Sequence, residues 1–190
     1  MNRKIKNIIN ITAFLVCIGL INIAGQNIEI EIRGMNAFTF ILIVAVLLQI
    51  IFFIPSFLLK TEKYYDLVGS LTYIATVSLA YFSVENKTMI DSIIYFYVMI
   101  WASRLGIYLF TRVRNVGKDV RFEKAKRHFF YFLQYWMGQA LWVSLTACAA
   151  IIAILSPEED TLPVLAMVGM ALWLSGCLLY TSPSPRDETK

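Results

Sequence analysis

Polar side chains that could take part in chemistry stand within, or at the edges of, long apolar stretches. Asp66, Ser70 and Tyr73 follow an i, i+4, i+7 spacing, which places them on one face of a helix. Arg104 lies about two turns inside another apolar stretch, where a charge is costly. It either extends toward the lipid headgroups or contacts a site within the bundle. We predict that Asp66 and Arg104 interact, because pairing would lower the cost of both charges.

A later apolar stretch carries Gln134, Trp136, Gln139 and Trp142. Such residues are commonly interface anchors or hydrogen-bond partners between helices. Gln134 and Gln139 are also candidates to line a cleft.

The segment 112–128 is strongly basic and contains His128, the only histidine of the chain. A basic loop of this kind is a topology signal or contacts anionic lipid, and it could equally hold the phosphates of a nucleotide. No catalytic partner lies near His128 in sequence. The cysteines Cys17, Cys148 and Cys177 lack metal-binding spacing, so we expect small buried residues and no metal site.

The elements that position these residues are apolar segments of membrane-spanning length. The chain has 190 residues, 58% of them hydrophobic and 16% charged. Six segments approach the roughly 20 residues that a spanning helix needs, and Pro55 is expected to kink the second. They cover residues 8–24, 37–59, 66–84, 92–111, 129–155 and 162–180. Because lipid offers the backbone no hydrogen-bond partner, the sequence predicts an all-α, polytopic transmembrane helix bundle.

The connecting loops alternate in charge. Lys and Arg collect before the first segment and in the loops 60–65 and 112–128, whereas Glu and Asp dominate the other loops. This alternation predicts that both termini are cytoplasmic, in the inner membrane if the source is bacterial. The formal charge of +4 is explained by the same pattern. The expected partners are therefore the lipid bilayer and a hydrophobic small molecule, and not nucleic acid.

Four stretches together resemble a known family. They lie at residues 57–70, 104–112, 117–122 and 139–143. In this order they are similar to a bacterial branch, of unknown function, of the steroid 5α-reductase-like membrane proteins. The resemblance runs from about Phe53 to Gly176.

The resemblance implies an enzyme that uses NADPH to reduce a carbon–carbon double bond in a lipid. On this reading Tyr73 donates a proton, and Arg104, Asp119 and Arg121 support the cofactor. Asp66, Gln134 and Gln139 would line the cleft. Related proteins methylate isoprenylcysteine with S-adenosylmethionine, so a methyltransferase-like enzyme is an alternative. A membrane protein without catalytic activity, such as a transporter subunit or scaffold, is another.

The sequence departs from the family pattern in two places. Phe52 and Phe53 stand where steroid reductases carry an adjacent Gln-Glu pair before Pro-Ser-Phe, so a steroid enone is not the expected substrate. After Gly176, residues 177–190 resemble a translated sequencing adapter and replace the expected cofactor-binding half. We therefore expect residues 1–176 to be a fragment that binds NADPH weakly or not at all.

Overall fold

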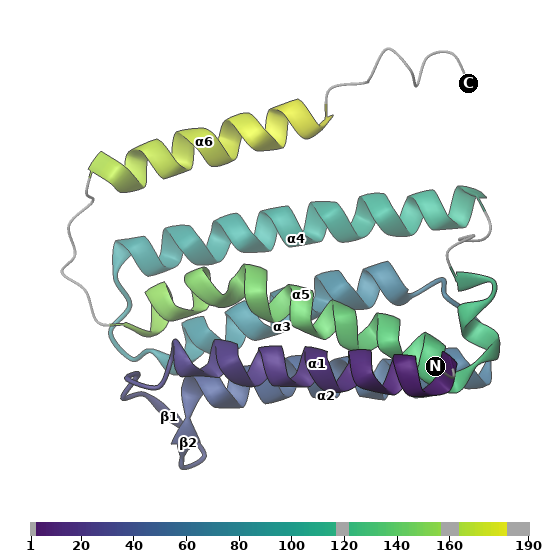
Figure 1. Cartoon of the computed structure of the whole chain (residues 1–190). Coiled ribbons are helices and arrows are strands. Elements are labelled where there is room, and N and C mark those ends of the chain that lie inside the picture. Colours follow the sequence, from purple (N-terminus) through teal and green to yellow (C-terminus); the bar gives the residue numbers. More distant parts are fainter. Residues whose placement is uncertain (1–2, 117–121, 157–163, 182–190) are drawn as a thin grey trace. The chain divides into compact units, whose positions relative to one another are not determined.

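The protein is a bundle of long helices in the computed structural model, which describes residues 3–116, 122–156 and 164–181 (Figure 1). The chain forms two units, Met1–Glu158 and Glu159–Lys190. The described residues of the first unit include five α-helices, the 3-10 helix η2 and two short strands, and those of the second form one α-helix. Their bounds are α1 Arg3–Ile23, β1 Glu31–Ile32, β2 Met35–Asn36, α2 Ala37–Leu58, α3 Tyr65–Ser83, α4 Met89–Val116, η2 Ala125–Arg127, α5 Phe129–Leu155 and α6 Val164–Thr181.

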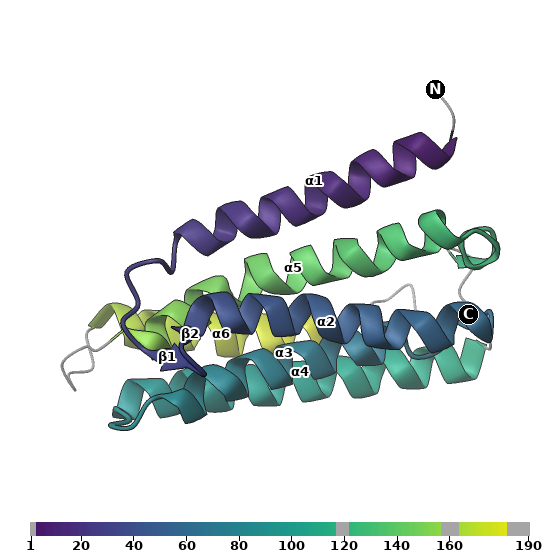
Figure 2. The same cartoon turned by 90° about the horizontal axis from the view of Figure 1, so that it is seen from below.

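Within the first unit, α5 contacts all four other α-helices, and α3 contacts three. Helix α3 packs against α2, α4 and α5, while α1 packs mainly against α5 (Figure 2). Small buried side chains let the helix backbones approach closely, as is common in membrane bundles. The fully buried alanines include Ala37 on α2, Ala80 on α3, Ala102 on α4 and Ala140 on α5. The predicted all-α fold class is confirmed.

The predicted spans correspond to helices, with one correction. Four helices are long and apolar enough to cross a membrane: α1, α2, α4 and α5. Helix α3 is too polar to qualify by composition, and in α6 the described side chains form the apolar stretch Met167–Gly176. Composition therefore supports four of the six predicted spans. Helix α3 nevertheless contacts α4 near both of its ends, through Asp66 and through Tyr81.

A small hairpin between α1 and α2 was not predicted. Strands β1 and β2 pair in antiparallel orientation around Arg33 and Gly34, whose φ angles are +54° and +75°. Two consecutive positive φ angles define the tight turn that suits a two-residue hairpin. Asn36 then caps α2 by accepting a hydrogen bond from the Thr39 N–H at 3.1 Å.

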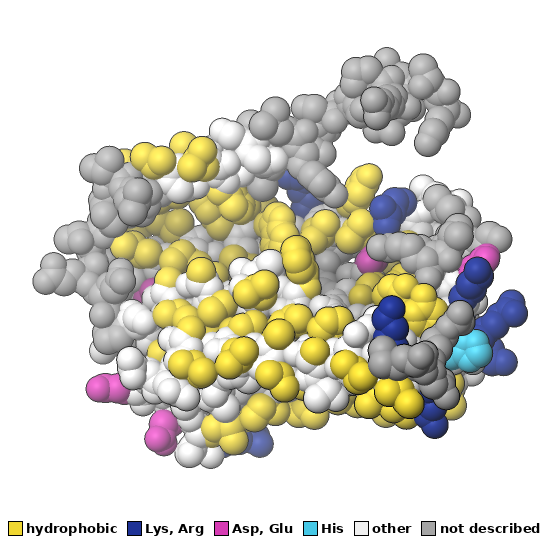
Figure 3. Space-filling view, in the orientation of Figure 1, with side chains coloured by type: hydrophobic (Ala, Val, Ile, Leu, Met, Phe, Trp, Pro, Cys, Tyr) yellow, Lys and Arg dark blue, Asp and Glu magenta, His cyan; other side chains and the backbone are white. Residues whose placement is uncertain are grey.

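The basic segments meet at one end of the first unit. The Lys4 ammonium lies 5.3 Å from the centre of the Phe130 ring, which joins the start of α1 to the start of α5. The Lys126 side chain reaches Glu62 in the α2–α3 loop. On the face shown in Figure 3, most Lys and Arg side chains gather at the end that also carries the histidine. This arrangement agrees with the predicted alternation of basic and acidic loops.

The cysteines were predicted to be buried, and the structure describes the side chains of two of them. Cys148 is partly buried on α5, but Cys17 is exposed on α1. The expectation is wrong for Cys17, because a spanning helix presents apolar residues to lipid as well as to its neighbours. The side chain of Cys177 lies outside the described part of the chain.

Candidate functional site

The predicted face of α3 is the one that packs on α4. Asp66 forms an ion pair with Arg112 at 3.7 Å. A Cβ atom built on Gly106 would lie 2.8 Å from the Cβ of Ser70, so the two helices nearly touch there. One turn further, the Tyr73 and Trp101 rings pack edge to face with centroids 4.9 Å apart. The three α3 residues thus share one face, and we call this contact the α3–α4 seam.

Asp66 has an ion-pair partner that the sequence analysis did not name, and its contact with Arg104 stays a prediction. The structure pairs Asp66 with Arg112, which lies two turns beyond Arg104 on α4. The side chain of Arg112 is 46% exposed and that of Asp66 is 14% exposed, so water can reach the pair. An exposed pair of this kind contributes at most about 1 kcal/mol to stability. Arg104 is half-buried one turn from Trp101, on the path from the basic end to Tyr73.

Tyr73 is buried, with 5% of its surface exposed. Its hydroxyl lies 2.5 Å from the Thr146 hydroxyl on α5. The Thr146 hydroxyl donates its own proton to the Trp142 carbonyl at 2.7 Å. Since a hydroxyl has a single proton, the phenol of Tyr73 is the donor to Thr146, and a substrate that accepts this proton has to take the place of Thr146. Thr146 is exposed on the outer face of α5.

A second polar region lies between α2, α3 and α5. The carboxamide nitrogen of Gln49 donates to the Thr72 hydroxyl at 2.9 Å, and both residues are fully buried. The carboxamide of Gln139 fills the space that a side chain at Gly69 would need. Of the predicted cleft residues, Gln139 therefore lies in this region, which we call the polar seam and define as Gln49, Thr72, Trp136 and Gln139. Gln134 is also partly buried.

Sequence reasoning missed Gln49. The signal was available, because Gln49 is the only amide side chain in the most apolar helix. A lone amide in such a surrounding needs a partner, and Thr72 supplies one.

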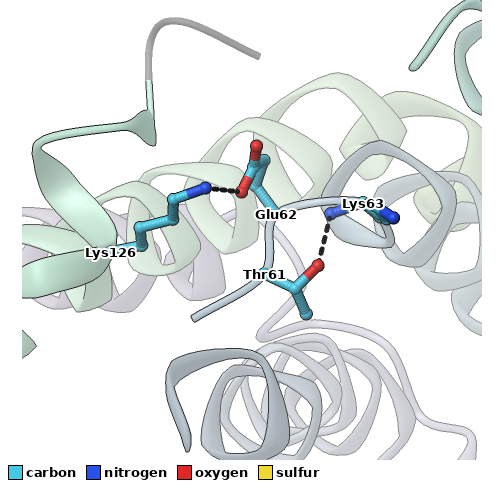
Figure 4. Close-up of polar contacts among 4 residues, drawn as sticks. All are labelled: Thr61, Glu62, Lys63 and Lys126. Carbon is cyan, nitrogen blue, oxygen red and sulfur yellow. Dashed lines mark hydrogen bonds and ion pairs between the residues drawn. The ribbon is translucent and has the colours of Figure 1, made fainter. Parts of the chain in front are cut away.

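Beside these seams, the basic end holds a buried ion pair. Glu62, with 4% of its side chain exposed, accepts a hydrogen bond from the Lys126 ammonium at 2.7 Å (Figure 4). Nearby, the Tyr65 hydroxyl donates to the Tyr135 carbonyl at 2.9 Å. The buried Phe122 packs on the Tyr65 ring, with centroids 4.7 Å apart. These contacts fix the end of the 112–128 loop against the start of α3.

The loop itself is only partly described. Asp119 and Arg121, predicted to support a cofactor, lie outside the described residues. The described residues contain no group of three or more His, Cys, Asp or Glu side chains that could hold a metal ion. The described cations of the basic end, such as Arg112, Arg114 and Lys124, have the chemistry that phosphate oxygens require.

Apolar spanning helices, polar side chains turned inward and charged loops define an integral α-helical membrane protein. Within that class, the chain belongs to a family described as a protein of unknown function, DUF1295, whose model matches residues 52–182. No curated protein matches the chain. No solved structure matches it either.

The match also bears on the expected junction after Gly176. It extends six residues past that position, and α6 continues to Thr181 without ending at Gly176. The predicted change of sequence after Gly176 stays a prediction.

Proposed function

We propose that this protein is a membrane oxidoreductase that uses NADPH to reduce an activated carbon–carbon double bond of a lipid-soluble substrate. The observation that carries the proposal is the position of the Tyr73 phenol. The Tyr73 hydroxyl is hydrogen-bonded to the hydroxyl of Thr146, and Thr146 is exposed on the outer face of α5. A substrate dissolved in the bilayer can therefore approach the phenol proton from the lipid side, at the position of Thr146.

The resemblance of the loops and of the Arg104 segment to steroid 5α-reductase-like proteins supports NADPH as the reductant. When bound, NADPH supplies a hydride to one carbon of the double bond. Tyr73 gives its proton to the other carbon and recovers a proton from water. Arg104, Asp119 and Arg121 would hold the cofactor on the cytoplasmic side, where Asp66 forms an ion pair with Arg112. The bacterial inner membrane is the proposed location.

The test is reduction of membrane lipid by the purified protein in vesicles. The chain of 190 residues and the complete reading frame of its gene are each incubated with extracted lipids and deuterated NADPH, and products are identified by mass spectrometry. We expect deuterium in a lipid product from the complete reading frame. Tyr73→Phe should lower the rate by about 10²–10⁴-fold with unchanged NADPH affinity, as for loss of a general acid.

The control is Tyr131→Phe, which removes a phenol whose hydroxyl lies 3.5 Å from the Tyr135 hydroxyl at the basic end. It should leave the rate unchanged. Transfer of a methyl group from S-adenosylmethionine, with no incorporation of deuterium, would overturn the reductase proposal in favour of the methyltransferase alternative. Equal NADPH affinity of both proteins would show that residues 1–190 suffice to bind the cofactor.

A further inference from the structure

The polar seam contains buried polar atoms without hydrogen-bond partners among the described residues. They are the carboxamide oxygens of Gln49 and Gln139 and the indole nitrogen of Trp136. Gln49 and Trp136 have no exposed surface at all. A buried polar atom left without a partner costs about 1–3 kcal/mol, so three of them in one region need an explanation.

These side chains lie along neighbouring turns of the bundle. The Gln49 amide nitrogen contacts Thr72, and Gln139 packs against Gly69, one turn earlier on the same helix. Phe53 lies one turn after Gln49, and its ring centre is 6.4 Å from that of Trp136.

Helices α2, α3 and α5 are thus joined at the seam by direct contacts. Trp136 and Gln139 are separated by three residues on α5 and share a face of that helix.

The unpartnered atoms of the polar seam determine which chemical group could bind there. Two carboxamide oxygens accept hydrogen bonds, and one indole N–H donates one. A hydroxyl or water matches this set because its oxygen accepts while its protons donate. A metal cation does not fit, since the indole N–H would point a positive dipole at it. An anion does not fit, since two oxygens would face it.

We propose that the polar seam binds one neutral hydroxyl-bearing group, either a water molecule or the hydroxyl end of a lipid-like alcohol. The group accepts from Trp136 and donates to Gln49 or Gln139, and water donates to both. It joins α2 to α5 at a point where the side chains alone leave polar atoms unsatisfied. This inference does not depend on the proposed reductase activity, because it requires neither NADPH nor Tyr73.

The proposal is tested by whether Gln139→Met lowers or raises Tm. Gln139→Met keeps the length of the side chain and removes its polar atoms. If the seam is occupied, the substitution breaks a hydrogen bond, and Tm should fall by about 2–4 °C for each kcal/mol lost. If the oxygen is merely unsatisfied, removing it should leave Tm unchanged or raise it. Thermal unfolding is followed by circular dichroism in dodecylphosphocholine, a detergent that carries no hydroxyl.

The matched control is Ser144→Ala on the same helix. Ser144 is 2% exposed, and its hydroxyl also lacks a partner among the described residues, but it lies more than one turn beyond the seam. Its removal should leave Tm unchanged or raise it. Only Gln139→Met should then lower Tm. A Gln139→Met protein at least as stable as the parent would overturn the proposal.

Magnetic resonance of the indole group separates the two sources. Nitrogen-15 labelling of tryptophan gives indole signals for the four tryptophans, and the Trp136→Phe variant identifies that of Trp136. A cross-relaxation peak between this N–H and water in delipidated protein supports the water form. A cross-relaxation peak between this N–H and the protons of a long-chain alcohol, seen only when the alcohol is added, supports binding of a lipid-like alcohol. No peak to either, together with a stable Gln139→Met protein, would refute both.

Discussion

Replacing Lys60 by glycine should stabilise the protein. Lys60 follows the end of α2 with a φ angle of +50°, in the left-handed region. The Thr61 N–H donates to the Ser56 carbonyl at 2.9 Å and the Lys60 N–H to the Phe57 carbonyl at 3.2 Å. These two bonds form the helix-terminating motif that most often carries glycine at this position.

The magnitude follows from two opposing terms. A side chain in the left-handed region costs roughly 1–2 kcal/mol, and glycine avoids this cost. Glycine also makes the unfolded chain more flexible, which costs about 0.4–1 kcal/mol. Lys60 is exposed, so its side chain contributes no buried contact that would be lost. We expect a net gain of about 0.5–1 kcal/mol in the free energy of unfolding.

The assay is equilibrium unfolding by dodecyl sulfate in mixed micelles, followed by circular dichroism. The matched control is Lys63→Gly, which removes the same charge from an exposed position without a positive φ angle in the same loop. This control should destabilise by up to about 1 kcal/mol. The reasoning fails if Lys60→Gly is no more stable than Lys63→Gly.

Three further outcomes are expected. Gly106→Ala should lower the free energy of unfolding by about 1–3 kcal/mol through its clash with Ser70, and Ser70→Gly should restore most of the loss in the same unfolding assay. Tyr73→Phe and Thr146→Val should each lower the free energy of unfolding by about 1 kcal/mol. The double variant should lose much less than the sum of the two, because each substitution removes the same hydrogen bond. Losses that add would contradict the contact. A cysteine introduced at Lys118 should resist an impermeant thiol reagent in intact cells and react after lysis, since the loop is predicted to be cytoplasmic; labelling of intact cells would reverse the topology.

Much of the fold could be predicted because helix geometry is local. The spacing of Asp66, Ser70 and Tyr73 fixes a common face whatever surrounds the helix, and the structure confirms it. The apolar runs likewise predicted helices at nearly correct positions, since a backbone in lipid has few alternatives. The roles of Tyr73, Asp119 and Arg121 remain predictions.

The ion pair between Asp66 and Arg112 could not be predicted because it depends on the register between two helices. Arg104 and Arg112 are eight residues apart, about 12 Å along α4. Charge and helix face allow either one to pair with Asp66. The register between α3 and α4 is fixed at two other points. The backbone of Gly106 leaves room for Ser70, and the Trp101 ring packs on the Tyr73 ring. These steric contacts set the register, and Arg112 is then brought to the carboxylate.

The polarity of α3 has the same tertiary origin. Hydropathy measures how well a helix suits lipid, but α3 lies between three other helices and buries eight residues, four of them polar. Thr72 and Thr76 donate to carbonyls one turn earlier at 2.7 and 2.8 Å, so their hydroxyls need no water. A helix that packs against three others can therefore fall short of a span by composition and still contact α4 near both of its ends. Both seams lie on this helix, and the polarity that disqualifies α3 as a span by composition is what places chemical groups inside the membrane.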